Sequence, residues 1–490
     1  MRTLLALLDK KGENVVPKFV AALEKTQTNG ETCFGLSTSS EILRAEKLGD
    51  LHAEKVSSSV ACGYASTKAS LNEPFTMKLR EATLTFDGRV FSAGAKHSID
   101  SVVEKNLEPD LLKSAQTILK TVEGEFALII SQTESIVAAR DPVGVQPLYY
   151  GETPDLEAIA SNRATLWRLG IDDAKSFPPG HILTATKKSL KFIPVRVLKF
   201  EPPTAVGMTE AAEILQKLLE KSVKKRVAGQ KEVAVAFSGG LDSTIVACLA
   251  KQSGVDVRLV HVSLKNQSET EEARRAAEAL ELPIEEHLFE ESDVEREISR
   301  VVELVEEPDP IKAAVGLPFF WNAQSAAKSG LRVMLAGQGA DELFGGYQRY
   351  VNEYILGGEE AVRRTMFHDV QVIHESNIER DEKICGFFDV ELRLPFASYE
   401  VAKFAMSLPT QLKFEKKTDS LRKLVLRKAA QNMGIPKELS EKPKKAIQYS
   451  TGINSALKKI ARRQDLSMAD YVNQIFLDAK MKSKTSKERV

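Results

Sequence analysis

Residues 231–252 read KEVAVAFSGGLDSTIVACLAKQ, and this stretch decides the fold of the second half of the chain. Val233–Phe237 is a short apolar run typical of a strand buried on both faces, and a run with helical spacing follows Gly239-Gly240. A strand, a glycine turn and a helix in this order direct backbone N–H groups and a helix N-terminus at one point beyond the strand. The stretch therefore predicts an anion-binding loop, to which Ser238 and Ser243 can add hydroxyl donors.

Asp242 distinguishes this loop from the commonest phosphate-binding loop. The chain contains no GxxxxGK(S/T) sequence, so no lysine of that motif can reach a terminal phosphate. A carboxylate beside a phosphate repels it unless a divalent cation lies between them, which implies Mg²⁺. A Gly-Gly turn before an acidic helix start is common on its own, but the complete word SGGLDS is rare by chance. We interpret the loop as a site for phosphate groups and Mg²⁺.

The loop at residues 238–243 resembles the pyrophosphate loop of the ATP pyrophosphatases, enzymes that cut ATP between the α and β phosphates. Leu331–Tyr350, LRVMLAGQGADELFGGYQRY, resembles the second signature of asparagine synthetases. The similarity continues through Asn377–Asp381, Glu391–Phe396 and Lys442–Gly452. The resemblance implies a ligase that adenylates a carboxylate and then amidates it, with release of AMP and pyrophosphate. Aspartate is the first candidate for this carboxylate.

The resemblance also implies where ATP and Mg²⁺ bind. Asp242 in the first glycine turn and Asp341 in the second would hold the metal, and adenine would lie against backbone at the strand ends. The residues expected to bind ATP or pyrophosphate are Phe237, Ser238, Gly239, Gly240, Leu241, Asp242, Ser243, Leu264, Ala336 and Gly337. Outside this context, Asp341-Glu342 would be interpreted as an acidic pair that stabilises a helix N-terminus.

Three residues are expected to take part in the chemistry, namely Lys445, Gln338 and Glu342. In PKKAIQYSTG, residues 443–452, the family keeps a lysine that stabilises charge on the transferring phosphate. Lys444 and Lys445 fit this position to within one residue, and we choose Lys445. A surface lysine pair is the alternative interpretation.

Gln338 departs from the family pattern, in which the motif GEGSDE has glutamate at this position. An amide cannot take the proton that a carboxylate takes, so Gln338→Glu is expected to raise ammonia-dependent amidation. The β-lactam synthetases, related enzymes that close a ring, carry tyrosine there. Three hypotheses stay open: amidation of aspartate, adenylation of another small carboxylate including ring closure, and ATP binding without catalysis. Asp242 and Asp341 together disfavour the last, because binding alone does not require both.

Residues 1–200 are expected to form short strands separated by turn clusters, with one amphipathic helix near Val15–Lys25. Glu123–Ala127 (EGEFA) and Arg140–Tyr149 (RDPVGVQPLY) resemble signatures of the class II glutamine amidotransferase domain. The resemblance implies an α+β sandwich of the N-terminal-nucleophile amidohydrolase type, with two sheets in α/β/β/α layers.

Three positions that glutaminase chemistry requires are changed in this chain. Arg2 stands where the family has its cysteine nucleophile, and a guanidinium cannot replace a thiolate. Asn29 stands where the family has an arginine for the glutamine carboxylate, and Asp87 replaces an asparagine that donates to an oxyanion. Cys33 or Cys62 as a relocated nucleophile would have no adjacent α-amine as base. We therefore expect no glutamine hydrolysis, and free ammonia as the nitrogen source.

Strands alternate with helices after a linker at Phe200–Val206, which predicts an α/β doubly wound parallel sheet followed by a helical C-terminal part. Both glycine turns follow strand ends, so they can face one crevice. We divide the chain into an amidotransferase-like domain (1–200), an ATP pyrophosphatase domain (207–480) and a polar tail (481–490). The lysine-rich stretches Lys413–Lys417 and Lys423–Lys428 are expected to be solvated surface.

The overall composition excludes several other classes of function. Lys+Arg and Asp+Glu both number 68, so no broad field favours nucleic acid or an anionic membrane. No apolar run is long enough to span a membrane, and Met1–Leu8 is expected to be a strand and not a signal peptide, so we expect a cytoplasmic protein. The spacings of the cysteines and histidines do not match those of zinc or iron–sulfur sites, so we expect no metal bound by these two residue types. The expected partners are ATP, an aspartate-like carboxylate and ammonia; a homodimer is open.

Overall fold

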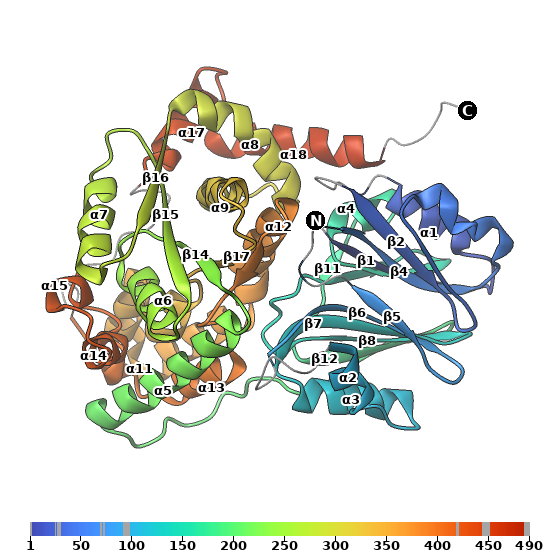
Figure 1. Ribbon diagram of the computed structural model, residues 1–490, viewed down its shortest axis with the longest axis horizontal. Helices are drawn as coiled ribbons and strands as arrows, with labels where there is room; N and C mark the ends of the chain where they lie inside the picture. Colours follow the sequence, from blue (N-terminus) through green and yellow to red (C-terminus); the bar gives the residue numbers. More distant parts are fainter. Residues whose placement is uncertain are drawn as a thin grey trace.

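The computed structural model describes residues 2–24, 26, 31–68, 71, 74–91, 99–417, 421–442 and 451–484. It contains two regions that lie side by side in Figure 1. The N-terminal sandwich, residues 3–194, holds two antiparallel sheets, and the C-terminal α/β region, residues 208–484, holds one parallel sheet. This arrangement confirms the fold class predicted from the sequence.

The N-terminal sandwich consists of a seven-stranded and a six-stranded sheet packed face to face. Leu4, Ala6 and Leu8 of β1 point into the core between the sheets, where they meet Ala127 and Ile129 of β7. Alternate residues of each strand thus face opposite sides, as the pleat of a strand requires. In sheet order, the first sheet is β11 (Lys175–Ser176), β9 (Tyr149–Glu152), β10 (Leu156–Ala160), β1 (Thr3–Asp9), β4 (Val60–Thr67), β2 (Thr32–Ser37) and β3 (Ile42–Ala45). The second is β13 (Ser189–Pro194), β12 (His181–Thr186), β8 (Ser135–Arg140), β7 (Gly124–Ser131), β6 (Thr83–Val90) and β5 (Phe75–Lys78).

Helices cover both outer faces of the sandwich. Figure 1 shows α1 (Val16–Leu23) and α4 (Arg163–Arg168) on the first sheet, and α2 (Ile99–Glu104) and α3 (Leu111–Thr121) on the second. Asp110 caps α3 by accepting hydrogen bonds from two N–H groups of its first turn. Helix α1 confirms the early helix expected near Val15–Lys25, and the layered sandwich is confirmed, whereas the sequence analysis does not predict the later helices α2, α3 and α4.

The C-terminal α/β region is built on five parallel strands in the order β16-β15-β14-β17-β18. Val233 and Val235 of the central strand β14 lie in one core and Ala234 lies in the other, as expected for a strand covered on both faces. The strands are β16 (Ile284–Phe289), β15 (Asp256–Leu264), β14 (Glu232–Ala236), β17 (Val333–Leu335) and β18 (Glu391–Arg393). The sequence does not predict β16, a charged edge strand, or β18, which has three residues.

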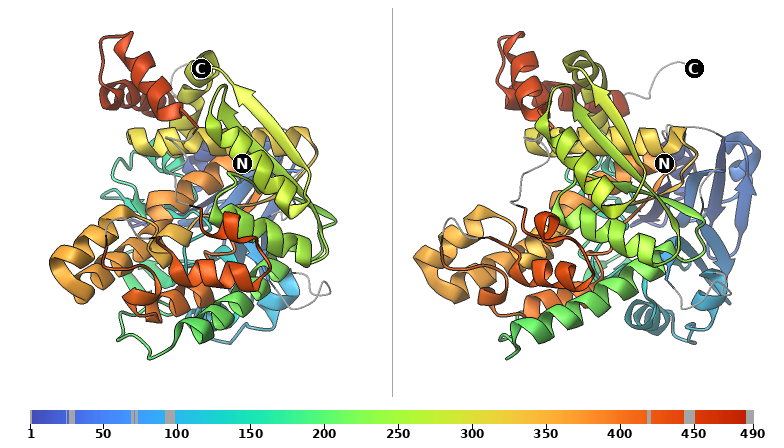
Figure 2. Two further views of the ribbon diagram at one scale, coloured as in Figure 1. Left: turned by 90° about the vertical axis from the view of Figure 1, so that its left-hand side faces the viewer. Right: turned by 60° about the vertical axis from the view of Figure 1, so that its left-hand side comes forward.

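Helices pack on both faces of the parallel sheet. Residues of α5, α6, α7, α13 and α14 share one core, and residues of α8, α9, α12, α17 and α18 share the other. Figure 2 shows α17 and α18, in red, beside α8 at one end of the region. The helices are α5 (Met208–Val227), α6 (Leu241–Gln252), α7 (Ser268–Leu280), α8 (Glu291–Val305), α9 (Pro310–Lys328), α10 (Ala340–Phe344), α11 (Gln348–Gln371), α12 (Glu379–Phe387), α13 (Tyr399–Ser407), α14 (Leu424–Asn432), α15 (Lys437–Ser440), α17 (Ile453–Arg462) and α18 (Met468–Lys484). Among the described residues, none of the helices combines the length and apolar character that a membrane span needs.

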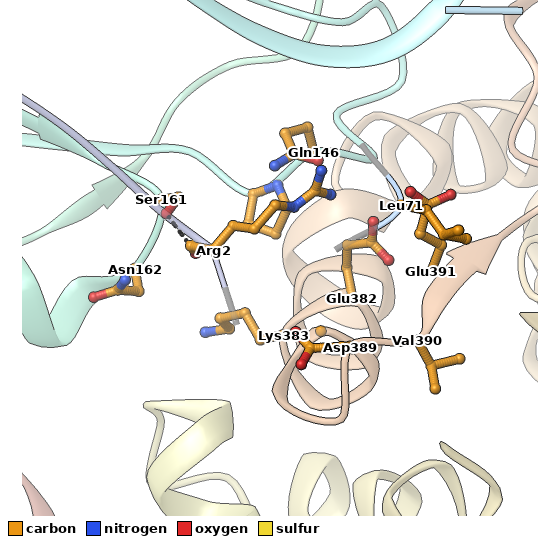
Figure 3. A pocket seen from close by; sticks show the side chains of 12 residues that line it. Arg2, Leu71, Gln146, Ser161, Asn162, Glu382, Lys383, Asp389, Val390 and Glu391 are labelled. Atoms are coloured by element: carbon orange, nitrogen blue, oxygen red, sulfur yellow. Dashed lines mark hydrogen bonds between the residues drawn. The ribbon is translucent and has the colours of Figure 1, made fainter. Parts of the chain in front are cut away.

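Charged side chains from both regions meet in a largely buried group that we call the interface cluster. Its members are Arg2, Asp87, Arg89 and Glu125 of the sandwich and Arg226, Glu382, Glu391 and Arg393 of the α/β region. Arg89 Nε lies 2.6 Å from Glu125, and Arg226 Nη2 lies 2.9 Å from the same carboxylate. Four cations face four anions, so the charges removed from water are mutually compensated. Figure 3 shows three of its members, Arg2, Glu382 and Glu391, in the lining of a small pocket.

Glu379, at the start of α12, makes a second set of contacts across the boundary. Its carboxylate lies 3.0 Å from Arg140 Nη1 and accepts a hydrogen bond of 2.7 Å from the Tyr149 hydroxyl group. Burial alone would raise the pKa of Glu379, but Arg140, His374 and Arg163 outweigh it and hold this pKa at about 2.

We expect the contribution of Glu379 to stability to diminish on acidification. A carboxylate whose pKa is lower in the folded chain stabilises the fold above its unfolded pKa, near 4.5, and loses this effect as the pH falls towards 2. The difference in unfolding free energy between wild type and Glu379→Gln should therefore shrink by roughly 1–2 kcal/mol between about pH 5 and about pH 3. Denaturant titrations at both pH values measure this difference, and a constant difference would contradict the depressed pKa.

Candidate active site

The candidate site is a cavity of about 950 Å³ at the carboxyl ends of the parallel strands. This volume lies within the range of pockets that bind cofactors and small molecules. The chain passes outward from β14 to β15 and β16, and then returns to β17 and β18 on the other side. Ligands of open α/β sheets bind where the strand order reverses in this way. The loops after β14 and β17 both line the cavity.

The loop after β14 has the conformation of an anion-binding turn. Gly239 has a φ of 67°, and a Cβ at this position would lie 2.8 Å from Ala273 Cα, so only glycine fits without strain. The Ser238 and Ser243 hydroxyl groups lie 3.4 Å apart, and Ser238 Oγ accepts a hydrogen bond from the Gly240 N–H. Because α6 begins at the next residue, the loop combines hydroxyl donors with the positive end of a helix.

Asp242 and Asp341 hold the same lysine. Lys423 Nζ lies 2.6 Å from Asp242 Oδ2 and 2.7 Å from Asp341 Oδ1, and its side chain is 3% exposed. Burial alone would lower the pKa of Lys423, but the two aspartates outweigh burial and raise it, so its ammonium group is charged. The expectation that the lysine-rich stretches are solvated holds for Lys416 and Lys417, which are exposed, and is wrong for Lys413, Lys423 and Arg427, which are buried.

Close backbone packing brings the two aspartates together. A Cβ at Gly337 would lie 2.7 Å from Asp242 Cβ, and one at Gly346 would overlap the Asp341 carboxylate. Two carboxylates that converge on one cation suit Mg²⁺, which prefers oxygen ligands and keeps water and phosphate in its shell. Within the described ranges, no group of three or more histidine, cysteine, aspartate or glutamate residues forms a metal site. Water and phosphate oxygens would supply the further ligands of a metal held by these two carboxylates.

Besides Lys423, the cations that line the cavity include Arg422, Arg427 and Lys442. Arg427 Nη1 donates a hydrogen bond of 2.6 Å to the carbonyl group of Ser440, and Lys442 Nζ lies 2.8 Å from Glu272. Together with Lys423 they make this wall positive, and the sequence analysis above does not single them out. Lys423 is the N-cap residue of α14 and Arg427 lies in the first turn of that helix, so one helix start places both of them.

At the other end of the cavity, the lining residue Gln338 covers the buried carboxylate of Asp381. Gln338 Nε2 donates a hydrogen bond of 2.6 Å to Asp381 Oδ2, and Arg380 Nε donates one of 2.7 Å to Asp381 Oδ1. Asp381 is fully buried, and this burial raises its pKa against the opposing effect of Arg380. A π-helical turn, His374–Ile378, introduces α12 just before these residues, and such turns are frequent at functional sites.

Glu342 lies between the two ends of the cavity and is enclosed by partners. Its Oε1 accepts hydrogen bonds of 2.6 Å from the Tyr347 hydroxyl group and 2.8 Å from Asn377 Nδ2. The side chain therefore joins the second glycine turn to the π-helical turn, and it is placed to support the site through these neighbours.

Comparison with known families identifies the chain. The model of asparagine synthase matches residues 215–357 and 352–489, and that of a glutamine amidotransferase domain matches residues 70–168. The chain belongs to the asparagine synthase family. ATP is a substrate of this family, which agrees with the phosphate loop and with the cations of the cavity.

Curated relatives include several asparagine synthetases. A Methanocaldococcus jannaschii protein, provisionally named asparagine synthetase 1 (glutamine-hydrolyzing), is 30% identical over 71% of this chain and 73% of its own length. Glutamine-hydrolyzing asparagine synthetases of Sandersonia aurantiaca and Arabidopsis thaliana are 27% and 26% identical, and this chain spans 64% and 60% of their lengths. A Bacillus subtilis glutamine phosphoribosylpyrophosphate amidotransferase structure aligns over 58% of this chain and 80% of its own, at 13% identity and a TM-score of 0.32.

Most positions that the asparagine synthase resemblance assigns to ATP lie at the cavity. Its lining includes Phe237, Ser238, Gly240, Leu241, Asp242, Ser243, Ala336, Gly337, Gln338, Asp341 and Glu342. Gly239 and Leu264 do not line the cavity, although the Leu264 N–H donates a hydrogen bond to the carbonyl group of Thr451, which does. Lys444 and Lys445 lie outside the described residues.

In this asparagine synthase family member, two of the positions that the resemblance relates to glutaminase chemistry, Arg2 and Asp87, face one another. Arg2 Nη1 lies 3.2 Å from Asp87 Oδ1, and the Gln146 amide donates to Asp87 Oδ2 at 2.7 Å. The cavity beside Arg2 has a volume of only about 50 Å³, and Figure 3 shows its lining. Burial raises the pKa of Cys62 to about 12, the opposite of what a nucleophile requires. Asn29 lies outside the described residues.

We expect Gln338→Glu to lower amidation by roughly one to two powers of ten, which reverses the expectation from the sequence. The new carboxylate would lie within hydrogen-bond distance of Asp381, and two carboxylates at this distance cannot both stay ionised. The double variant Gln338→Glu, Asp381→Asn exchanges the positions of the amide and the carboxylate, so the pair still contains one of each. This variant should recover much of the lost rate. Ammonium-dependent AMP formation measures both variants; an undiminished rate in the single variant would contradict the reversal.

Proposed function

We propose that the chain is an asparagine synthetase-like ligase that adenylates a carboxylate, with aspartate as the first candidate, and amidates the adenylate with free ammonia. The reaction cleaves the bond between the α-phosphorus and the bridging oxygen to the β-phosphate, and it gives AMP and pyrophosphate. In this proposal residues 207–480 form the ATP pyrophosphatase domain, and residues 1–200 form an amidotransferase-like domain without glutaminase activity.

The convergence of Asp242 and Asp341 on one cation carries this proposal. The two carboxylates come from different glycine turns, at the ends of neighbouring strands. They lie beside a loop whose hydroxyl and backbone N–H groups can donate hydrogen bonds to an anion. Nucleotide binding alone does not require two convergent carboxylates, whereas release of pyrophosphate requires that its charge be neutralised.

The residues of the SGGLDS loop and the cations Lys423 and Arg427 have different roles in binding the phosphates. The SGGLDS backbone and hydroxyl groups bind the β and γ phosphates, and Lys423 and Arg427 offset their charge. Asp242 and Asp341 would hold Mg²⁺, which, when bound, neutralises the charge that develops on departing pyrophosphate. Lys445 is assigned to the transferring phosphate by resemblance alone.

The far end of the cavity is suited to an acidic acceptor and an amine. Lys312, Arg349 and Arg380 line the cavity, each in an ion pair with a carboxylate of the chain, and side chains of this kind can bind a substrate with more than one carboxylate. Gln338 Nε2 is engaged by Asp381, which leaves its Oε1 to accept an N–H of the incoming ammonia. The nitrogen attacks the acyl carbon, AMP leaves with the C–O bonding electrons, and the surplus proton passes to solvent.

Pyrophosphate release by the purified protein tests this proposal. The assay combines ATP, Mg²⁺ and ammonium chloride with a panel of carboxylates that includes aspartate, glutamate and monocarboxylates. Aspartate-dependent formation of AMP and pyrophosphate in equal amounts, with asparagine as product, is the expected result. Turnover with another carboxylate only would reject aspartate and keep the ligase chemistry. No turnover with any of them would support an ATP-binding protein without catalysis.

A further inference from the structure

Helix α12 presents different faces to the two regions of the molecule. Glu379 and Glu382 are one turn apart and face the N-terminal sandwich. Asp381 follows Glu379 by two residues, which is about 200° around the helix, and it faces Gln338 in the cavity. One rigid element therefore connects the altered amidotransferase-like region with the end of the cavity that we assign to the acceptor and the amine.

The sandwich grips the first of these glutamates with three side chains. Arg140 lies 3.0 Å from Glu379, the Tyr149 hydroxyl donates to it at 2.7 Å, and the Ser176 hydroxyl donates to its other oxygen. Arg140 is itself fixed by the carbonyl groups of Gly144 and Gln146, so it cannot follow the helix if the helix moves.

The second glutamate is held one turn further along. Glu382 Oε1 accepts a hydrogen bond of 2.5 Å from Arg89 of β6, within the interface cluster. Glu382 and Arg89 are both buried, so neither charge can leave the other without a large desolvation cost. Figure 3 shows Glu382 on α12 pointing toward the side of the cavity that carries Arg2 and Gln146. Two anchors one turn apart fix both the rotation of α12 and its position along its axis.

We propose that the N-terminal sandwich serves as a positioning element for amidation, because it holds α12, and through Asp381 the Gln338 amide, in the orientation that receives ammonia. Arg89, Arg140 and Tyr149 are positioning residues in this scheme, since none of them lines the active-site cavity. The inference rests on the proposed function for the identity of the nucleophile. It gives the amidotransferase-like region a task that does not require glutamine.

Two conservative variants and one matched control test the inference. Tyr149→Phe removes the hydroxyl donor to Glu379 and keeps the aromatic ring, and Glu382→Gln weakens the contact with Arg89. The control is Glu123→Gln, which breaks the ion pair with Lys225 of α5 across the same boundary without touching α12. Hydrogen exchange of the three variants and wild type is followed in residues 379–387, 337–342 and 238–243.

We expect exchange in the Tyr149→Phe and Glu382→Gln variants to rise roughly tenfold in residues 379–387 and 337–342, and to stay unchanged in residues 238–243. In steady-state assays the KM for ammonium should rise roughly tenfold, while the KM for ATP stays within about twofold. The Glu123→Gln control should match wild type in both measurements.

Three results would overturn the inference. Unchanged exchange in residues 337–342 would mean that α12 does not transmit the contact to Gln338. A uniform rise in exchange, or equal rises in both KM values, would mean that the contacts serve stability alone. Faster exchange with an unaltered KM for ammonium would separate the motion from amidation. If wild type forms no AMP with any carboxylate, the proposed function fails, and the exchange measurement still decides whether the sandwich positions Gln338.

Discussion

Replacing either Asp242 or Asp341 by asparagine is expected to lower pyrophosphate formation by on the order of 10³-fold or more. Each substitution removes one of the two carboxylates proposed to hold Mg²⁺ while pyrophosphate departs. Both variants should fold, because Lys423 keeps the remaining aspartate as a charged partner and no buried cation is left alone. Pyrophosphate release at saturating ATP and varied Mg²⁺ measures the effect, with circular dichroism to verify the fold.

Asp470→Asn provides a control for this experiment, since Asp470 bonds to Ser467 on the surface of the C-terminal helices, away from the cavity. It should retain the wild-type rate. Turnover of either active-site variant near the wild-type rate in Mg²⁺ would show that the two glycine turns do not hold a catalytic metal.

Glutamine is expected to fail as nitrogen donor, even after Arg2→Cys. Loss of a nucleophile costs about 10⁶ in rate, and a cysteine at position 2 would restore only one of the three groups that we expect from the sequence to be altered. The substitution also removes the cation nearest Asp87, a fully buried carboxylate, and breaking such a pair costs on the order of 3 kcal/mol. We therefore expect Arg2→Cys to lower the melting temperature and to release no glutamate from glutamine.

Arg2→Lys separates the two effects, because it keeps the positive charge and lacks a thiol. It should retain more stability than Arg2→Cys and show the same absence of glutaminase activity. Glutamate release with and without ATP is compared with AMP formation during an ammonium titration. Glutamate produced by the wild type at a rate comparable with AMP would contradict the prediction and indicate a nucleophile elsewhere, with Cys33 as the first residue to change.

Short motifs in the sequence predict the framework of the site, because a strand, a glycine turn and a helix are each determined by residues that are neighbours in the chain. SGGLDS and the turn that carries Asp341 are of this kind, and both lie at the cavity. Lys423 is different: its neighbours read as a charged surface, and only the tertiary packing of α14 buries it between two aspartates. The same holds for Asp381, since the pairing with Gln338 joins residues 43 positions apart. Side chains that meet across the fold leave no local pattern to find.

The lysine shared by Asp242 and Asp341 has a consequence for the order in which ligands arrive. An ammonium group fixed to the protein acts as a tethered competitor at a very high effective concentration. A bare divalent cation must displace it and leave its charge buried without a counter-ion, so occupancy by the ion alone is disfavoured. A cation that arrives bound to a polyphosphate brings phosphate oxygens with which the displaced lysine can pair. The two aspartates then pair with the metal ion and the lysine pairs with the phosphate, so no charge is left without a partner. The cavity thus discriminates against free metal and in favour of the metal–nucleotide complex.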